Sequence, residues 1–352
     1  MCRVLHLRIV APREVADQAL DLLEANDSVI NVVVLPDAAR KPPGDVILCD
    51  VAREDASIVL SDLRHLGIEK CGSISMEHVD SHMSELAEEA EKAARGTPAD
   101  AVIWEEVASR TSEESTFSGS YFAFLILAMF IAAVGIFLDS PILIVGAMVV
   151  GPEFGPIAGF CVALVQRRVS LAGRSFAALA VGFPLGIGLT VLLTLVFKST
   201  GVTPDTFTAQ DHSLSTSIAN PDFLAFFVAF CAGIAGMLSL TTAKSGALIG
   251  VLISVTTIPA AANVGVGLAY GDGDSARGSL EQLGINIGSI LLAGTLTLVI
   301  QRLLYARRKR RHLEALGVLG GAADGRRRGG SVGALTGPTP STRATTTRRS
   351  SS

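Results

Sequence analysis

Apolar and polar positions alternate in short runs over the first 80 residues, which predicts a small domain with four strands and two helices. Strands are expected at 4–10, 28–35, 45–52 and 72–79, and helices at 12–23 and 54–66. The order strand-helix-strand-strand-helix-strand is that of the split βαβ arrangement. We therefore expect residues 1–80 to form an α+β domain with a ferredoxin-like fold.

Two polar helices are expected next, over a connector at residues 81–118. The first is the charged stretch SELAEEAEKAARG, and the second is the amphipathic stretch DAVIWEEVASRTSEES. Trp104 lies on the apolar stripe of the second helix. Tryptophan is enriched where a membrane meets water, so Trp104 marks either that boundary or a packing contact with the preceding domain.

The pattern changes at residue 119, where long apolar runs replace the short alternation. A span needs about 20 apolar residues. Six runs qualify: Tyr121–Leu138, Pro141–Val165, Phe176–Phe197, Phe223–Leu240, Ser245–Leu268 and Leu280–Leu304. We expect residues 119–305 to form an all-α polytopic membrane domain of about six spans.

Composition supports this division and sets an orientation. Hydrophobic residues make up 49% of the 352 positions and charged residues 18%, which excludes an ordinary soluble enzyme. Residues 1–118 carry 23 acidic and 11 basic side chains, a net charge of −12, whereas the rest of the chain has a net charge of +8. Basic clusters follow the second and sixth spans, so an even number of spans places both termini in the cytoplasm of an inner-membrane protein. Residues 306–352 are expected to be a basic juxtamembrane segment and a disordered tail.

No motif for catalysis or cofactor binding occurs in the sequence. The five cysteines have no metal-ligand spacing, and no phosphate-binding loop or hydrolase signature is present. We expect no catalytic residues, no metal site and no cofactor. The expected partner is membrane lipid, with a second copy of the chain as a further candidate, and no nucleic acid is expected.

The stretch VGAMVVGPEFGPIAGF at 145–160 carries the main functional signal. Glu153 lies inside the second apolar run, between Pro152 and Pro156 and beside Gly151 and Gly155. Two prolines so close together break or kink a helix. A carboxylate at membrane depth is costly and usually functional. The alternative is a kinked packing helix with a neutral Glu153 bonded to backbone.

A weak internal repeat suggests what faces Glu153. FIAAVGIFL at 130–138 resembles FCAGIAGML at 230–238, and Pro259 of the fifth run is a rough counterpart of the prolines around Glu153. Three spans per half make this a 3+3 inverted-topology repeat, in which broken helices meet near the midplane. Thr256, Thr257 and Asn263 would then join Glu153 in binding a ligand, with Asn286 as a further polar candidate. Asp139 is expected to cap the helix that starts at Pro141.

Several of these strings together resemble a bacterial membrane-protein family known as domain of unknown function 389. The matching strings are GDVILCDV, WEE at 104–106, EES at 113–115, IAAVGIFLDS and PILIVGAMVVGPEFGPI. The resemblance covers about residues 1–305. It implies a soluble N-terminal domain followed by a multi-span domain in the inner membrane, and it implies no activity.

The sequence thus predicts a transporter or channel-like protein for a cation or small polar solute, regulated by its cytoplasmic domain. Glu153 would supply the charge, and Gly151, Pro152, Gly155, Pro156 and Pro259 would break the helices. The alternative is a membrane sensor or scaffold that transports nothing. An enzyme is not expected, because no second ionisable group lies near Glu153.

Overall fold

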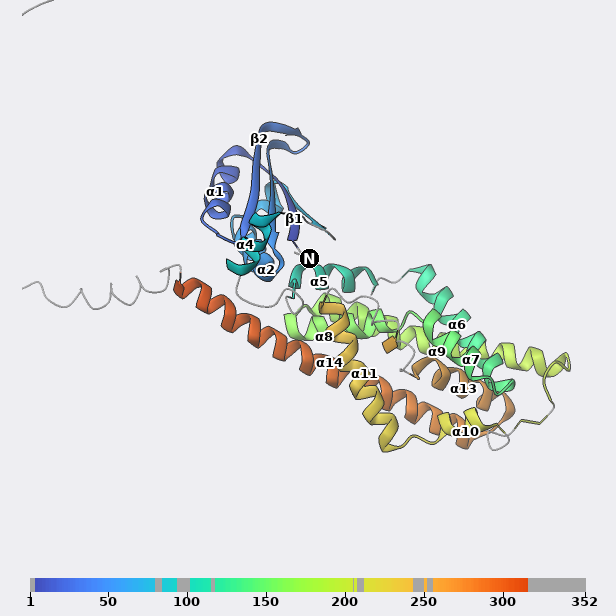
Figure 1. Ribbon diagram of the computed structural model, residues 1–352. Helices are drawn as coiled ribbons and strands as arrows, with labels where there is room; N and C mark the ends of the chain where they lie inside the picture. Colours follow the sequence, from blue (N-terminus) through green and yellow to red (C-terminus); the bar gives the residue numbers. More distant parts are fainter. Residues whose placement is uncertain are drawn as a thin grey trace, which may run out of the picture. The chain divides into compact units, whose positions relative to one another are not determined.

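The computed structural model describes most of the chain. The described residues are 4–79, 84–93, 102–114, 118–204, 206–207, 212–242, 250–251 and 256–315. The expected juxtamembrane segment and tail cover residues 306–352, and residues 316–352 of them lie outside the described residues. Figure 1 shows a small sheet domain and a region of long helices.

The N-terminal domain is built on one four-stranded antiparallel sheet. Its strands are β1 (Val4–Ala11), β2 (Val29–Arg40), β3 (Pro43–Ala52) and β4 (Ser73–His78). The strand order is β2-β3-β1-β4, so β1 and β3 lie at the centre. Strand β2 runs five residues past its expected end, because Arg40 pairs with Pro43 and the hairpin needs only two residues to turn.

Three helices accompany the sheet: α1 (Arg13–Glu24), α2 (Arg53–His65) and the short α3 (Ile68–Cys71). The core contains Leu7 and Ile9 of β1, Leu23 of α1 and Leu63 of α2, all of them buried. Successive strand residues point to opposite faces, so the odd positions of β1 supply this core. Helix α2 ends at His65, one residue before its expected end, and Gly67 follows with a φ of +74° that suits glycine.

The opposite face of the sheet is more polar. His6 Nδ1 lies 2.7 Å from Asp50 Oδ1, and Asn31 donates to Asp50 Oδ2 at 2.7 Å. Helix α4 (Glu85–Ala93) packs Ala87 against Val4 on a separate small cluster. Helix α5 (Trp104–Glu114) follows, with Trp104 buried. Both helices fall inside the expected connector.

The helical region begins at residue 119. Its helices are α6 (Gly119–Phe137), α7 (Pro141–Val150), α8 (Phe154–Gln166), α9 (Val169–Ser199), α10 (Ser213–Ala219), α11 (Phe223–Thr241), α13 (Thr257–Tyr270) and α14 (Gly273–Ala315). Three of them start with side chains that are typical of a helix start. Ser118 and Asp222 accept from backbone amides to cap α6 and α11, and Pro141 occupies the first turn of α7.

Four of these helices are long and apolar enough to cross a membrane, or five if the bent pair α7–α8 counts as one span. The remaining expected span, Ser245–Leu268, lies partly outside the described residues, and α13 covers its second half. Large apolar side chains are exposed on the outside, including Ile142 at 83% and Phe223 at 73%. The helices therefore fit a multi-pass membrane protein.

Glycines let these helices approach closely. A side chain at Gly186 of α9 would meet Met129 of α6, and one at Gly265 of α13 would meet Thr190 of α9. Close backbone approach through small residues is typical of helix packing in membranes. These contacts hold α6, α9 and α13 together around the break between α7 and α8.

The expected role of Asp139 is corrected by the structure. The residue that precedes α7 at its cap is Ser140, and it makes no side-chain capping bond. Asp139 instead accepts from Ser213 Oγ at 2.7 Å and from the backbone N–H of Leu214 at 2.9 Å. It thereby holds the start of α10, a short helix that hydrophobic periodicity did not reveal.

Candidate functional site

The break between α7 and α8 is the centre of the candidate site. Helix α7 ends at Val150 and α8 starts at Phe154, and their axes differ by 48°. Gly151, Pro152 and Glu153 form the connection. Proline has no backbone N–H and disfavours a helical conformation at the preceding residue, so Pro152 explains why the helix stops here.

Glu153 is buried at this break, with 3% of its surface exposed. Its Oε1 accepts a hydrogen bond of 2.7 Å from Thr257 Oγ1, the first residue of α13. Its Oε2 has no hydrogen-bond partner among the described residues. A Cβ atom at Gly151 would lie 2.4 Å from this oxygen, so glycine is needed for the carboxylate to fold back on the chain.

Helices α8 and α13 start in the same way. Glu153 occupies the cap position of α8 and Thr256 that of α13, and each helix has a proline three residues later, Pro156 or Pro259. The first-turn amides of a helix have no partner within it, so a proline there costs no hydrogen bond. Both prolines therefore lie in first turns. The start of a helix carries partial positive charge, which stabilises a carboxylate placed there.

Thr256, next to Thr257, opens a second set of contacts. Asn286 of α14 donates from Nδ2 to Thr256 Oγ1 at 2.8 Å. Gln282, one turn earlier on α14, donates from Nε2 to Asn286 Oδ1 at 3.0 Å. Gln282 is 4% exposed, and its Oε1 has no partner in the described part of the chain. The polar contacts thus extend from Glu153 through α13 to α14.

Asn263 makes a third set of contacts, nearer the loop that joins α13 to α14. Its Nδ2 donates to Ser279 Oγ at 2.8 Å and to the carbonyl of Ser215 at 3.3 Å, and it lies 3.5 Å from Ser275 Oγ. Its Oδ1 accepts from Ser215 Oγ at 2.8 Å. Ser215 belongs to α10, so this short helix is anchored on α13.

The four predicted ligand residues are therefore not gathered in one shell. Thr257 meets Glu153, whereas Thr256 and Asn263 turn toward α14. Helix geometry explains the division. Thr256 and Asn263 are seven residues apart and so lie on one face, whereas Thr257 is turned by about 100° from Thr256. Sequence reasoning missed Ser215, Ser279 and Gln282. The spacing of polar residues on α14 was a signal for the last two.

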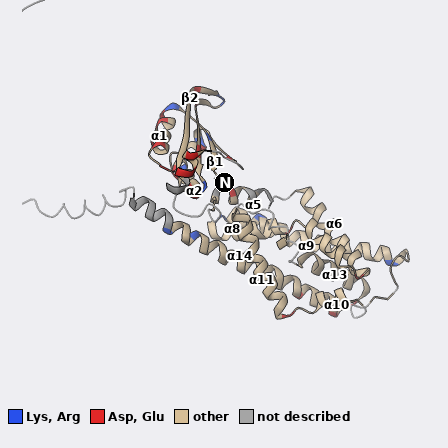
Figure 2. Cartoon of the chain, in the orientation of Figure 1, with Lys and Arg blue, Asp and Glu red and all other residues tan. Residues whose placement is uncertain are grey.

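The described residues of the helical region do not meet the requirements of a metal site or of a second buried charged site. No group of three or more His, Cys, Asp or Glu is placed to hold a metal ion there. Figure 2 shows that the charged residues of the helical region lie mostly near helix ends and in loops. Within the described residues 118–307, Glu153 is the one buried charged side chain.

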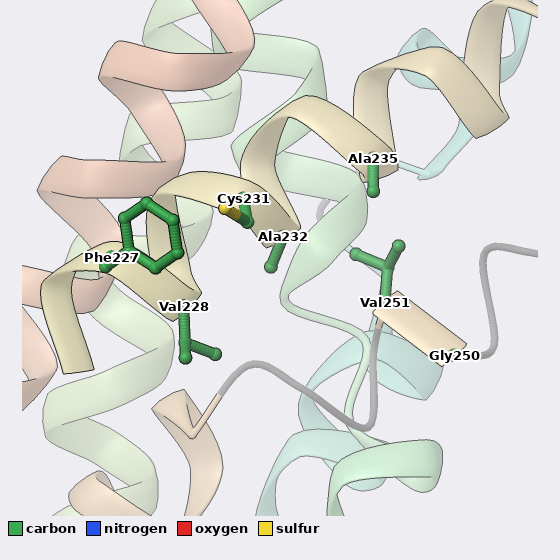
Figure 3. A pocket seen from close by; sticks show the side chains of 7 residues that line it. All are labelled: Phe227, Val228, Cys231, Ala232, Ala235, Gly250 and Val251. Carbon is green, nitrogen blue, oxygen red and sulfur yellow. The ribbon is translucent and has the colours of Figure 1, made fainter. Parts of the chain in front are cut away.

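A groove with a volume of about 370 Å³ lies along α11 (Figure 3). Its lining is apolar: Phe227, Val228, Cys231, Ala232, Ala235, Gly250 and Val251. Figure 3 shows these side chains along one side of α11, beside the short segment 250–251. The lining offers no charge and no strong hydrogen-bonding group, so it suits hydrocarbon.

Comparisons with known proteins agree with the family resemblance seen in the sequence. An uncharacterized protein of Methanocaldococcus jannaschii is 24% identical over 204 residues. That alignment covers 54% of this chain and 58% of the relative, so the chain spans less than two thirds of the relative's length. No solved structure matches. Residues 148–292, which include the Glu153 break, α13 and the first part of α14, match the family model described as domain of unknown function 389.

Proposed function

We propose that the helical region is a membrane transporter or channel-like protein for a cation or small polar solute, with Glu153 as its charged ligand. One observation carries this proposal. Glu153 is buried where a helix is broken, one of its oxygens is held by Thr257, and the other has no partner in the described chain. Burying an ionised carboxylate without a partner is costly, so a bound cation, proton or donor group would complete the site.

A repeated architecture supports this reading. Helices α8 and α13 both start inside the apolar region with a proline in the first turn, and the bond between Glu153 and Thr257 joins the cap of α8 to the first residue of α13. Broken helices that meet in this way are typical of secondary transporters with inverted repeats. We propose that α6 to α9 and α11 to α14 are the two halves, with six spans in all.

The N-terminal domain would have a regulatory role in this proposal. Its strand order β2-β3-β1-β4 and its helix placement support a ferredoxin-like fold. Its own polar cluster at Asp50 and His6 is separate from Glu153. With both termini in the cytoplasm of an inner membrane, the domain could respond to a cytoplasmic signal or pair with a second copy. We infer no catalytic activity.

Ion and solute flux in reconstituted vesicles tests the proposal. Purified full-length protein would be assayed for Na⁺, K⁺, proton and glycerol flux, and Glu153→Gln is expected to abolish whichever flux the wild type shows. Glu281→Gln is the matched control, because Glu281 is an exposed carboxylate on α14. Wild-type flux in Glu153→Gln would remove Glu153 from the mechanism.

A membrane sensor or scaffold is the second candidate, and the bonds of Asn263 favour it. Every polar atom of that side chain is used in contacts with Ser215, Ser275 and Ser279, which is how a purely structural polar cluster looks. A scaffold predicts that the surroundings of Glu153 stay dry. Absence of flux for all four probes, together with no solvent access to the break, would favour it over transport.

A further inference from the structure

A row of buried polar side chains follows one face of α14. Ser275, Ser279, Gln282, Asn286 and Ser289 are spaced by four, three, four and three residues, and each is at most 5% exposed. This spacing keeps all five on the same side of a helix. We call them the polar row. From Ser275 to Ser289 it extends about 21 Å, most of the way across a hydrocarbon core of about 30 Å.

The polar row faces α13 at two points that the site already uses. Near the loop, Ser275 and Ser279 meet Asn263, and farther along Asn286 meets Thr256. Thr256 adjoins Thr257, which holds Glu153. The row thus connects the loop end of the α13–α14 hairpin with the buried carboxylate.

Between these two points α13 gives the row no polar partner. Residues 258–262 of α13 are Ile, Pro, Ala, Ala and Ala. Gln282 lies between Ser279 and Asn286 on the row, and its Oε1 has no hydrogen-bond partner in the described chain although the side chain is buried. A buried carbonyl oxygen without a donor destabilises the folded state. It calls for a donor or a cation that the described residues do not supply.

Two of the buried atoms without a partner in the described chain indicate the chemistry that would complete them. Glu153 Oε2 and Gln282 Oε1 are both acceptors, so an anion would be repelled and a cation or a protonated amine would be bound. Among the described residues of the helical region, Glu153 is the one buried acidic side chain. One carboxylate with neutral oxygens balances one positive charge. A monovalent cation therefore fits better than a divalent one.

Helix α10 covers the loop end of the row. Its Ser215 is fully buried against Asn263, and its Ala219 carbonyl touches α14 so closely that a Cβ at Gly278 would lie 1.9 Å away. Asp139 holds the other end of α10 through Ser213 and Leu214. The helix is thus fixed at both ends over the point where a solute would enter from the loop side.

We propose that the polar row is the path by which a small monovalent cation reaches Glu153, and that α10 closes its loop end. The inference rests on the proposed transport function and adds the route, the charge of the solute and the element that gates it. Gln282 is a ligand along this route. Asn263 and Asp139 are positioning residues that keep α10 closed.

Cysteine accessibility tests the route without requiring flux. In a variant with all five native cysteines replaced by alanine, checked for wild-type elution and melting temperature, single cysteines would be placed at Ser279 and Ser289. The matched controls are Leu283→Cys, buried at 5% exposure on the same helix, and Leu292→Cys, exposed at 59%. The protein in lipid vesicles would be treated with methanethiosulfonate ethylammonium, a cationic thiol reagent.

The route predicts labelling of both row cysteines at least 10-fold faster than of the two leucine controls. The negatively charged ethylsulfonate reagent should label them at least 10-fold more slowly than the cationic one. Adding Asp139→Asn to Ser279→Cys should raise the labelling rate at least threefold by loosening α10. Equal, slow labelling of row and control cysteines would overturn the route, and an unchanged rate with Asp139→Asn would overturn the gate.

Because Ser→Cys adds little volume, two independent row positions protect the test against misfolding of one variant. The results also separate this inference from the proposed function. Rapid labelling of the row in vesicles that show no flux would refute transport and leave a hydrated polar row. Flux that depends on Glu153, with both row cysteines unreactive, would uphold transport and refute this route.

Discussion

The sheet domain and the helical region differ in the side chains that they leave exposed. The core of the sheet domain is apolar, with Leu7, Ile9 and Leu63 almost fully buried, although Asp45 and Glu54 are buried as well. The helical region exposes Ile142 and Phe223 and buries Glu153. The difference follows from the surroundings. Water drives apolar groups inward, whereas a lipid environment leaves polar side chains to find partners inside.

The largest effect expected from this comparison is on the sheet domain. Leu7→Ala should lower its free energy of unfolding by about 2–5 kcal/mol, because it removes fully buried methyl groups and leaves a cavity. Leu292→Ala, at an exposed position of α14, should change stability little, since its side chain meets lipid or detergent. Urea unfolding of the detergent-solubilised protein, followed by the fluorescence of Trp104, measures both. Equal losses would contradict this difference between the two regions.

A smaller effect is expected at the helix break. Gly151→Ala would place a Cβ 2.4 Å from Glu153 Oε2 and 2.7 Å from Ile258 Cγ1, so the carboxylate must move. Overpacking of this kind costs about 1–3 kcal/mol. Gly146→Ala is the control, because nothing lies within 4 Å of its Cβ. The melting temperatures of the two variants in detergent should differ clearly, and identical values would show that the break is pliable.

Asn263→Ala tests the buried polar contacts at the loop end. It leaves the Ser215 and Ser279 hydroxyls without their partner, at a cost of about 1–2 kcal/mol. Ser199→Ala, which removes only an exposed hydroxyl bonded within its own helix, is the control. Thermal unfolding in detergent should show a loss for Asn263→Ala alone. A loss equal to that of the control would mean that water replaces the amide.

The smallest effect concerns Asp139 and depends on pH. Its bonds from the Leu214 N–H and the Ser213 hydroxyl hold the pKa of Asp139 below its usual range, with a smaller contribution from His212. A lowered pKa in the folded state means that α10 is stabilised above the unfolded pKa and loses this stabilisation as pH falls through the folded pKa. Hydrogen exchange of residues 212–219, corrected for intrinsic rates, should increase on acidification and in Asp139→Asn at neutral pH.

Asp222→Asn is the control for that experiment, because Asp222 caps α11 and not α10. It should leave exchange in α10 unchanged. If acidification alone has no effect while Asp139→Asn does, the carboxylate holds α10 without titrating in the tested range.

Much of the fold is readable from the sequence because its signals are local. Period-two alternation placed β1 and β3, and the Gly-Pro-Glu string placed the break between α7 and α8 within a residue or two. The short helix α10 was missed, since seven residues carry too little periodicity and its stability comes from Asp139 and Asn263 far away in sequence. Tertiary contacts of this kind leave no local signal.

The candidate site was predictable only in part, for a similar reason. The sequence placed Glu153 opposite the start of α13, and Thr257 indeed meets it. Grouping Asn263 with Thr257 ignored the rotation of the helix, which turns Asn263 toward Ser279. Gln282 was not predicted as a site residue, because a glutamine near the end of a helix commonly lies on the surface. Its burial, which the sequence does not show, makes it noteworthy.

The meeting of two helix starts at Glu153 has a consequence for selectivity. The starts of α8 and α13 each carry partial positive charge, and the carboxylate that joins them through Thr257 offsets both. Replacing that carboxylate by an amide leaves the two dipoles uncompensated. The Glu153→Gln variant would then not only lose its cation ligand but also attract halide ions such as chloride. The partial positive charge of the two helix starts would act on these ions as it acts on phosphate at the start of a helix.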